Sequence, residues 1–173
     1  RSRNLGVGAL TVAQVDLLRE MSRKIEEPIQ ITLLDWHDTG DPCISGDDIS
    51  ILRMSRKDFL WPTRLWRHIR RSDLVLDIGA GDSFSDIYGR KRLRRICFLK
   101  YLVHLAQRRL VLSPQTFGPF TGRLSKRFAK LTIALSTLVF ARDEASLTHL
   151  RKIGVRRPVG VASDVALRMP AEP

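Results

Sequence analysis

Three short apolar runs in the middle of the chain each end in a polar or glycine-bearing turn. The runs cover residues 74–78, 110–112 and 137–140, and a segment with helical periodicity fills each gap between them. Short apolar strands that alternate with single helices indicate right-handed βαβ units and a parallel sheet. The hydrophobic pattern therefore predicts an α/β fold, with these three strands as parallel neighbours.

The flanking segments extend the same alternation. Apolar spacing and end signals such as Pro62 and Gly154 predict further helices over residues 10–25, 62–70, 91–107 and 143–153, and further strands at 29–34, 49–52 and 159–162. Two helices have a readable apolar face. On the 91–107 helix we expect a buried stripe, made of Leu93, Ile96, Leu99, Leu102, Val103 and Ala106. After Pro119 a second helix carries a stripe at the same spacing, made of Leu124, Phe128, Leu131 and Leu135.

Ligands of open parallel sheets bind in the crevice beyond the carboxyl ends of the strands. The three strands above lead into turns at residues 79–86, 113–120 and 142–146. We therefore expect these turns to meet at one edge of the sheet. Glycine at positions 79 and 81 lets the backbone approach a ligand closely, where a Cβ would interfere.

The composition is that of a globular protein. Of 173 residues, 43% are hydrophobic and 28% are charged, which excludes a disordered chain, and no apolar run is long enough to cross a membrane. Cys43 and Cys97 show no metal-like spacing and are expected to be free thiols of a reducing compartment. This predicts a cytoplasmic location.

Charge is distributed unevenly. Residues 90–130 contain twelve Lys or Arg and no Asp or Glu, whereas the rest of the chain has eighteen residues of each sign, for a net charge of +12. These cations either lie on solvated helix faces or attract an anionic partner, such as a phosphorylated substrate or an anionic inner-membrane surface. Nucleic acid is not an expected partner, because no recognised binding motif is present and only 7% of residues are aromatic.

Two polar clusters outside the three turns are weaker candidates. The glycine-containing loop at residues 4–9 precedes a helix, whose N-terminal N–H groups could bind an anion. His37, Asp38 and Asp41 could be drawn as a metal or acid–base cluster, but a turn rich in Asp, Gly and Pro needs no ligand. We expect no metal site and no cofactor.

Five motifs in order resemble the polysaccharide pyruvyl transferase family. They are Asn4-Leu-Gly-Val-Gly-Ala, Asp77-Ile-Gly-Ala-Gly-Asp-Ser-Phe-Ser-Asp, Ser113-Pro-Gln-Thr-Phe-Gly-Pro-Phe, Ala141-Arg-Asp-Glu-Ala-Ser and Ser163-Asp-Val-Ala-Leu. The resemblance covers nearly the whole chain. The family more often has three glycines where this chain has Gly79-Ala80-Gly81, and the alanine should narrow that loop slightly.

The resemblance implies a fold and a reaction. Members of that family have two Rossmann-like domains facing each other, as in GT-B glycosyltransferases, and this chain is similar to the first. We therefore expect a single Rossmann-like three-layer domain over residues 1–173, with a mostly parallel sheet, that lacks its first strand and its second domain. The implied activity is transfer of the enolpyruvyl unit of phosphoenolpyruvate to a sugar hydroxyl, forming a pyruvate ketal, and the implied acceptor is a saccharide, either free or lipid-linked.

The family's second domain carries a histidine- and arginine-bearing motif that binds phosphoenolpyruvate and supports acid–base steps. The four histidines of this chain do not match that motif; they are His37, His68, His104 and His149. The resemblance therefore implies that residues 1–173 alone are catalytically inactive and contain only part of the active site.

The expected site residues lie in the turns. Asp82 and Asp86 are the catalytic candidates, as bases or groups that orient sugar hydroxyls, although both could simply cap the following segment. Arg142 is suited to grip an anion in a bidentate fashion, or to pair with Asp143 or Glu144. The remaining substrate-binding candidates are Asn4, Gly6, Gly79, Gly81, Ser83, Gln115 and Thr116.

Two other functions fit the sequence. A GT-B-type glycosyltransferase half-domain would share the architecture and use a nucleotide sugar. A non-catalytic, basic anion-binding module would explain the charge of residues 90–130 without any catalytic site.

Overall fold

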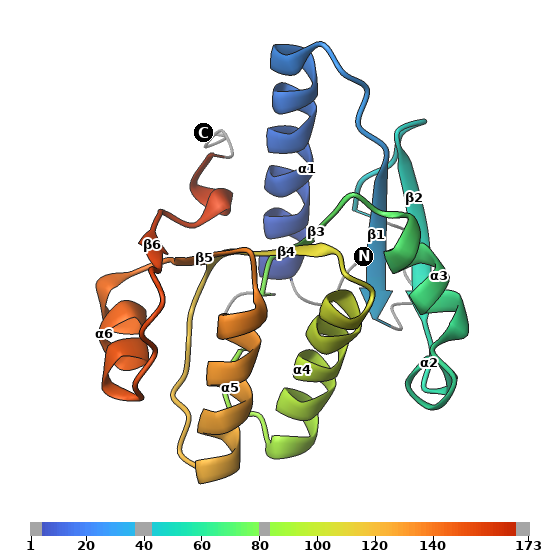
Figure 1. The fold of residues 1–173 in the computed structure, drawn as a ribbon. Helices are drawn as coiled ribbons and strands as arrows, with labels where there is room; N and C mark the ends of the chain where they lie inside the picture. The colour runs from blue at the N-terminus through green and yellow to red at the C-terminus, as the bar shows by residue number, and fades with distance from the viewer. Residues whose placement is uncertain (1–4, 37–42, 80–83, 169–173) are drawn as a thin grey trace. The chain divides into compact units, whose positions relative to one another are not determined.

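The computed structural model describes residues 5–36, 43–79 and 84–168 (Figure 1). Contacts between Cα atoms divide the chain into two compact units, one of residues 1–61 with 165–173 and the other of residues 62–164. The α/β class with parallel strands is confirmed. The expectation of a single domain over residues 1–173 stays a prediction.

The first unit combines a long helix with a two-stranded parallel sheet. Its elements are α1 (Leu5–Ile25), β1 (Ile31–Trp36), β2 (Ile49–Met54), α2 (Lys57–Leu60) and the 3-10 helix η1 (Val165–Arg168). β1 and β2 pair over their whole length, from Ile31 opposite Ile49 to Trp36 opposite Met54. η1 packs on α1, and Arg168 forms an ion pair with Glu20 at 2.7 Å. The short helix α2 is an element that the hydrophobic pattern did not predict.

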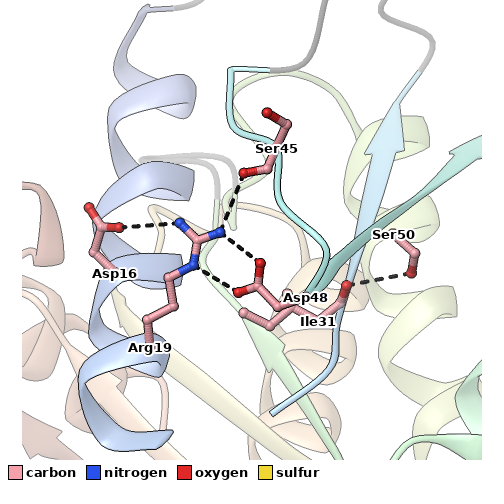
Figure 2. Close-up of polar contacts among 6 residues, drawn as sticks. All are labelled: Asp16, Arg19, Ile31, Ser45, Asp48 and Ser50. Carbon is pink, nitrogen blue, oxygen red and sulfur yellow. Dashed lines mark hydrogen bonds and ion pairs between the residues drawn. The ribbon is translucent and has the colours of Figure 1, made fainter. Parts of the chain in front are cut away.

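A bidentate ion pair ties α1 to the start of β2 (Figure 2). Arg19 Nε donates to one carboxylate oxygen of Asp48 at 2.8 Å, and Nη2 donates to the other at 2.7 Å. The same nitrogen also donates to the Ser45 carbonyl at 3.4 Å, and Asp16 lies 3.9 Å from Nη1. The Arg19 hydrogen bonds lower the pKa of Asp48. The guanidinium thus fixes the loop that enters β2 against α1.

The second unit is a four-stranded parallel sheet with the order β3-β4-β5-β6. Its elements are α3 (Thr63–Arg71), β3 (Leu74–Asp77), α4 (Arg90–Leu105), β4 (Arg109–Gln115), α5 (Arg123–Leu135), β5 (Leu138–Ala141), α6 (Glu144–Lys152) and β6 (Gly160–Val161). Strands that follow one another in space in chain order, with right-handed connections, place their helices on one face of a sheet. Figure 1 shows α4 and α5 side by side. The three strands predicted as parallel neighbours are confirmed.

The buried face of α5 differs from the predicted one. Leu124 and Leu131 are 58% and 50% exposed, whereas the buried positions are Ser125, Ala129, Thr132 and Ile133. Short side chains let α5 lie close to its neighbour α4, from which the Tyr101 hydroxyl donates to the Phe128 carbonyl at 3.1 Å. The predicted stripe of α5 is therefore not its buried face, because Leu124 and Leu131 are exposed and Phe128 and Leu135 are only half-buried.

The stripe predicted for α4 is partly right. Leu93, Leu102, Val103 and Ala106 are buried, and Ile96 and Leu99 are only half-buried. Cys97 and Lys100 are buried in addition. Burial raises the pKa of the Cys97 thiol. Both Cys97, which is buried, and Cys43, which is exposed, are free cysteines that form no disulfide.

The carboxyl end of α5 is held by an arginine from a distant loop. Arg157 lies between α6 and β6, and its guanidinium donates to the carbonyls of Ile133 at 3.1 Å, Ala134 at 3.2 Å, Ser136, and Thr137 at 2.7 Å. The last carbonyls of a helix have no partner within it, and the helix dipole is negative there. A cation with several donors satisfies both conditions at once.

Candidate functional site

The three turns expected at one edge of the second unit do meet there. The backbone N–H of Arg142 donates to the Gln115 carbonyl at 3.1 Å, which joins the ends of β5 and β4. The Asp86 N–H donates to the Pro119 carbonyl at 3.2 Å, and the Gly118 N–H to the Phe84 carbonyl at 3.0 Å. Backbone hydrogen bonds thus connect the segments after β3, β4 and β5, and the prediction of a shared edge is confirmed.

Gln115 lies at the centre of this edge. Its side chain is 1% exposed, and Nε2 donates to a carboxylate oxygen of Asp77 at 3.2 Å. Gln115 Oε1 and the hydroxyl of Thr116 are both buried without a hydrogen-bond partner among the described residues. Unsatisfied buried polar atoms are uncommon in folded proteins and call for an explanation. Here two of them occur in consecutive residues at the carboxyl end of a central strand.

The glycine in the turn after β3, Gly79, is needed for Gln115 to occupy this place. Gly79 has a φ of +67°, and a Cβ built on it would lie 2.6 Å from the Gln115 Cβ. Both the left-handed backbone and the close approach require glycine. Gln115 was expected in a turn, but it is the last residue of β4, and its side chain packs against the Gly79 backbone instead of lying free.

Asp77, which accepts the hydrogen bond from Gln115, also forms a buried ion pair with Lys100. The hydrophobic pattern did not identify this pair. Lys100 of α4 is 6% exposed, and its Nζ lies 2.7 Å from Asp77 Oδ2 and 5.0 Å from the centre of the Phe84 ring. Lys100 follows Leu93 by seven residues and Cys97 by three, so helical spacing alone places it on the buried face. That spacing was the signal that could have revealed it.

Asp86 occupies a structural position in the described residues. Its carboxylate accepts hydrogen bonds from the N–H groups of Thr121 at 2.9 Å and Gly122 at 3.1 Å, and from the Thr121 hydroxyl at 3.2 Å. Partial burial acts to raise the pKa of Asp86, but these bonds together with one from Ser125 lower it. The carboxylate therefore satisfies donors at the start of α5, a helix distant in the sequence, whereas the capping alternative expected it to cap the segment that follows it. A role as a catalytic base stays a prediction.

Arg142 is exposed at the end of β5, between two carboxylates. Its guanidinium lies 3.5 Å from Asp143 and 3.6 Å from Asp164, both longer than a hydrogen bond. Asp143 is engaged elsewhere, since it caps α6 by accepting from the Ser146 N–H at 2.6 Å. That backbone bond is the main cause of the lowered pKa of Asp143. The pairing expected with Asp143 is present, but it leaves the donors of Arg142 within reach of an anion.

The loop after β4 is fixed from below by α6. Ser146 Oγ accepts from the Phe117 N–H, and His149 Nε2 accepts from the Phe120 N–H, both at 3.2 Å. Phe84 packs edge-on against Phe117 and Phe120, with ring centres 5.6 and 5.5 Å apart. Burial, followed by the charges of Lys126 and Lys152, lowers the pKa of His149, and a neutral imidazole is the form that can accept this bond.

Several predicted residues lie outside the described parts of the chain. They are Asn4, Gly81, Asp82 and Ser83, together with the His37, Asp38 and Asp41 cluster. Gly6 belongs to the first turn of α1, in the other unit. Within the described ranges, no three His, Cys, Asp or Glu side chains are grouped so that they could hold a metal ion. In the same ranges, no helix has the length and apolarity of a membrane span.

Within the part of the chain that the structure describes, the site combines the exposed Arg142, the buried Gln115 Oε1 and Thr116 hydroxyl without hydrogen-bond partners, and the Gly79 turn at a single sheet edge. Residues 4–173 match the sequence model of the polysaccharide pyruvyl transferase family. No curated protein and no solved structure matches the chain.

Proposed function

The chain belongs to the polysaccharide pyruvyl transferase family, and on that premise we propose that it serves the transfer of the enolpyruvyl unit of phosphoenolpyruvate to a saccharide in polysaccharide biosynthesis. In this reaction a sugar hydroxyl adds to C2 of the enol while a proton goes to C3. A second hydroxyl of the same sugar then displaces phosphate from C2 and closes the ketal. No further cofactor is needed, because phosphoenolpyruvate itself carries the leaving group.

The observation that carries the proposal is the convergence of Arg142 with Gln115 at one sheet edge. Phosphoenolpyruvate is an anion with a phosphate and a carboxylate, and a guanidinium binds either group through two parallel hydrogen bonds. Arg142 lies one hydrogen bond from the Gln115 backbone, and its ion-pair partners are 3.5 Å or more away. We propose that Arg142 binds the anion, and that Gln115, Thr116 and the Gly79 turn contact the substrate.

Turnover requires an acid–base group within hydrogen-bonding distance of the reacting atoms. Among the described residues at this edge, Asp86 is occupied by the α5 terminus and His149 by the Phe120 N–H. We therefore propose that the acid–base group comes from a second domain of the kind the family has. On this proposal residues 1–173 bind the donor weakly, with a Kd on the order of millimolar, and do not turn it over.

A titration with phosphoenolpyruvate followed by NMR tests the binding role. We expect Arg142→Ala to abolish the chemical-shift changes of residues at the sheet edge. Arg142→Lys should retain part of the affinity, because lysine keeps the positive charge but lacks the two parallel donors of the guanidinium. Arg151→Ala is the matched control, since this exposed arginine lies in the last turn of α6. Equal binding by Arg142→Ala and Arg151→Ala would remove the proposed anion site.

An assay for ketal formation tests the second half of the proposal. Residues 1–173 are incubated with phosphoenolpyruvate and a saccharide acceptor, and released phosphate and ketal are measured. We expect neither product at any donor concentration. Ketal formation by these residues alone would show that the acid–base group lies in this chain, with Asp82 and Asp86 the first residues to test.

The proposed location of the protein is the cytoplasm, a reducing compartment in which free thiols such as those of Cys43 and Cys97 persist. The proposed donor substrate there is phosphoenolpyruvate. The proposed acceptor is a saccharide.

A further inference from the structure

A broad groove runs along the outer face of α5 in the second unit. It measures about 890 Å³ and is lined by residues 154–157 and by Leu124, Phe128, Leu131 and Ala134 of α5, which we call its floor. The ammonium of Lys130 lies close to Gly154, which also lines the groove. Leu124 and Leu131 of α5 are 58% and 50% exposed, whereas the leucines of an ordinary surface helix face the core.

The charges around this groove all have one sign. Arg127, Lys130 and Arg156 line it, and Arg123 lies at the start of the same helix. None of these four cations forms an ion pair with any residue of the described ranges, and no Asp or Glu is among the residues that line the groove. Arg157 also lines it, but its guanidinium is engaged by the carbonyls at the end of α5. The rim is thus positive and free to bind.

We propose that this groove face docks on an anionic lipid membrane. An exposed helix face that presents leucine and phenylalanine between lysines and arginines has the composition of an interfacial helix, whose apolar side chains enter the headgroup region while the cations bind lipid phosphates. The neighbouring helix α4 extends the positive field, since it has no acidic residue and carries five exposed cations, Arg90, Lys91, Arg92, Arg94 and Arg95. The inference concerns this surface alone and does not depend on the proposed reaction.

The chemistry favours a membrane over the two other partners of a basic surface. Nucleic acid is bound through cations together with aromatic or polar groups that stack on or pair with bases, whereas the floor here is aliphatic apart from Phe128. A second copy of this chain would bring an equally positive surface against this one, since the chain carries a net charge of +12. An anionic lipid surface matches both the sign of the rim and the apolar floor.

The test is co-sedimentation of the whole chain with vesicles of phosphatidylcholine alone or with 30 mol% phosphatidylglycerol added. We expect binding only to the anionic vesicles, weakening as salt is raised. The charge variant is Arg123→Gln/Arg127→Gln/Lys130→Gln, which should lower the affinity by about a hundredfold, at roughly 1 kcal/mol per cation near the surface. Its control, Arg67→Gln/Arg70→Gln/Arg71→Gln, removes three exposed cations of α3 and lowers the formal charge equally, from +12 to +9.

A second pair of variants tests the apolar floor. Leu124→Ser/Leu131→Ser should lower vesicle affinity about tenfold or more, because inserted leucine side chains leave water on binding. The control Leu105→Ser/Leu138→Ser removes two exposed leucines outside the groove and should change nothing. Circular dichroism confirms that each variant is folded before it is used.

Three results would overturn the proposal. Equal losses from the α5 and α3 charge variants would mean that only net charge matters. Unchanged binding by the leucine variant, with tight binding of single-stranded DNA lost in the α5 charge variant, would assign the surface to nucleic acid. A dimer in sedimentation velocity that dissociates in the leucine variant, without vesicle binding, would assign it to self-association.

Discussion

Replacing Lys100 with methionine should strongly destabilise the second unit. The Lys100 ammonium is almost fully buried at 2.7 Å from Asp77, whose side chain keeps 26% of its exposure. Removing one partner of a buried pair costs about 3–5 kcal/mol, because the other charge is left without compensation. Asp77 retains some water and the hydrogen bond from Gln115, so we expect Lys100→Met to lower the free energy of unfolding by about 2–4 kcal/mol.

Urea unfolding followed by far-UV circular dichroism measures this effect in a double-mutant cycle. The cycle consists of the original chain, Lys100→Met, Asp77→Asn and the double variant. Replacing both charges by neutral groups removes the uncompensated charge, so the double variant should be more stable than Lys100→Met. The coupling free energy between the two positions should be about 1–3 kcal/mol.

The control is Lys91→Met, which neutralises an exposed lysine of the same helix and should change stability by less than about 0.5 kcal/mol. If Lys100→Met is as mild as Lys91→Met, or if the effects of Lys100→Met and Asp77→Asn simply add, then the ion pair does not support the sheet edge as the structure implies.

Three further predictions concern the residues that hold the loops. Asp86→Ala should lower the free energy of unfolding in urea by about 1–2 kcal/mol, and Asp86→Asn should lower it clearly less, because the amide oxygen of asparagine still caps α5. Equal losses in the two variants would contradict a capping role. Arg157→Ala should lower the free energy of unfolding by about 2–3 kcal/mol, and Arg157→Lys roughly half as much, since one ammonium cannot reach all the carbonyls. A loss below about 0.5 kcal/mol in Arg157→Ala would show that water hydrogen-bonds to these carbonyls equally well. His149 has a lowered pKa in the folded chain, so its contribution to stability is fully present above its ordinary pKa of about 6.5 and is lost as the pH falls through the folded value. His149→Gln should therefore flatten the rise in unfolding free energy as the pH increases toward about 6.5, whereas the exposed-site control His104→Gln should keep it.

The strands and most helix ends could be predicted because their signals are local. Apolar runs placed β3, β4 and β5 within a few residues. Asp143 and Gly154 marked the two ends of α6, where Asp143 caps the helix and Gly154 adopts a φ of +85°. Such features depend on residues that are neighbours in the sequence, so periodicity and turn chemistry suffice to find them.

The contacts that shape the site could not be predicted, because they join residues distant in the sequence. Gln115 was placed in a turn, and only the pairing of β4 with its neighbours shows that the strand continues and directs the amide against Gly79. Asp86 was assigned to catalysis from its position after the glycine turn, while the donors that occupy it lie 35 residues and more further along the chain. A pattern within one segment carries no information on such partners.

The face of α5 shows a different limit. Leucine spacing identifies an apolar stripe but not the direction in which it points. On α5 the core side is filled by Ser125, Ala129, Thr132 and Ile133, of which the short side chains permit close approach to α4, and Leu124 and Leu131 are left facing outward. The interpretation of such a pattern assumes that an apolar stripe faces the core, and on α5 that assumption fails.

Asp86 and Arg157 together have a consequence for the motions of α5. Isolated helices fray because their terminal N–H and carbonyl groups are unsatisfied, but here a carboxylate from the segment before α4 holds one end and a guanidinium from the segment before β6 holds the other. The end turns therefore open only when those two segments also detach. In hydrogen exchange, the amides of α5 should exchange together with residues 84–89 and 154–157 as one cooperative unit. We therefore expect little fraying at either end of α5, so that Leu124 and Leu131 keep the same orientation relative to the sheet.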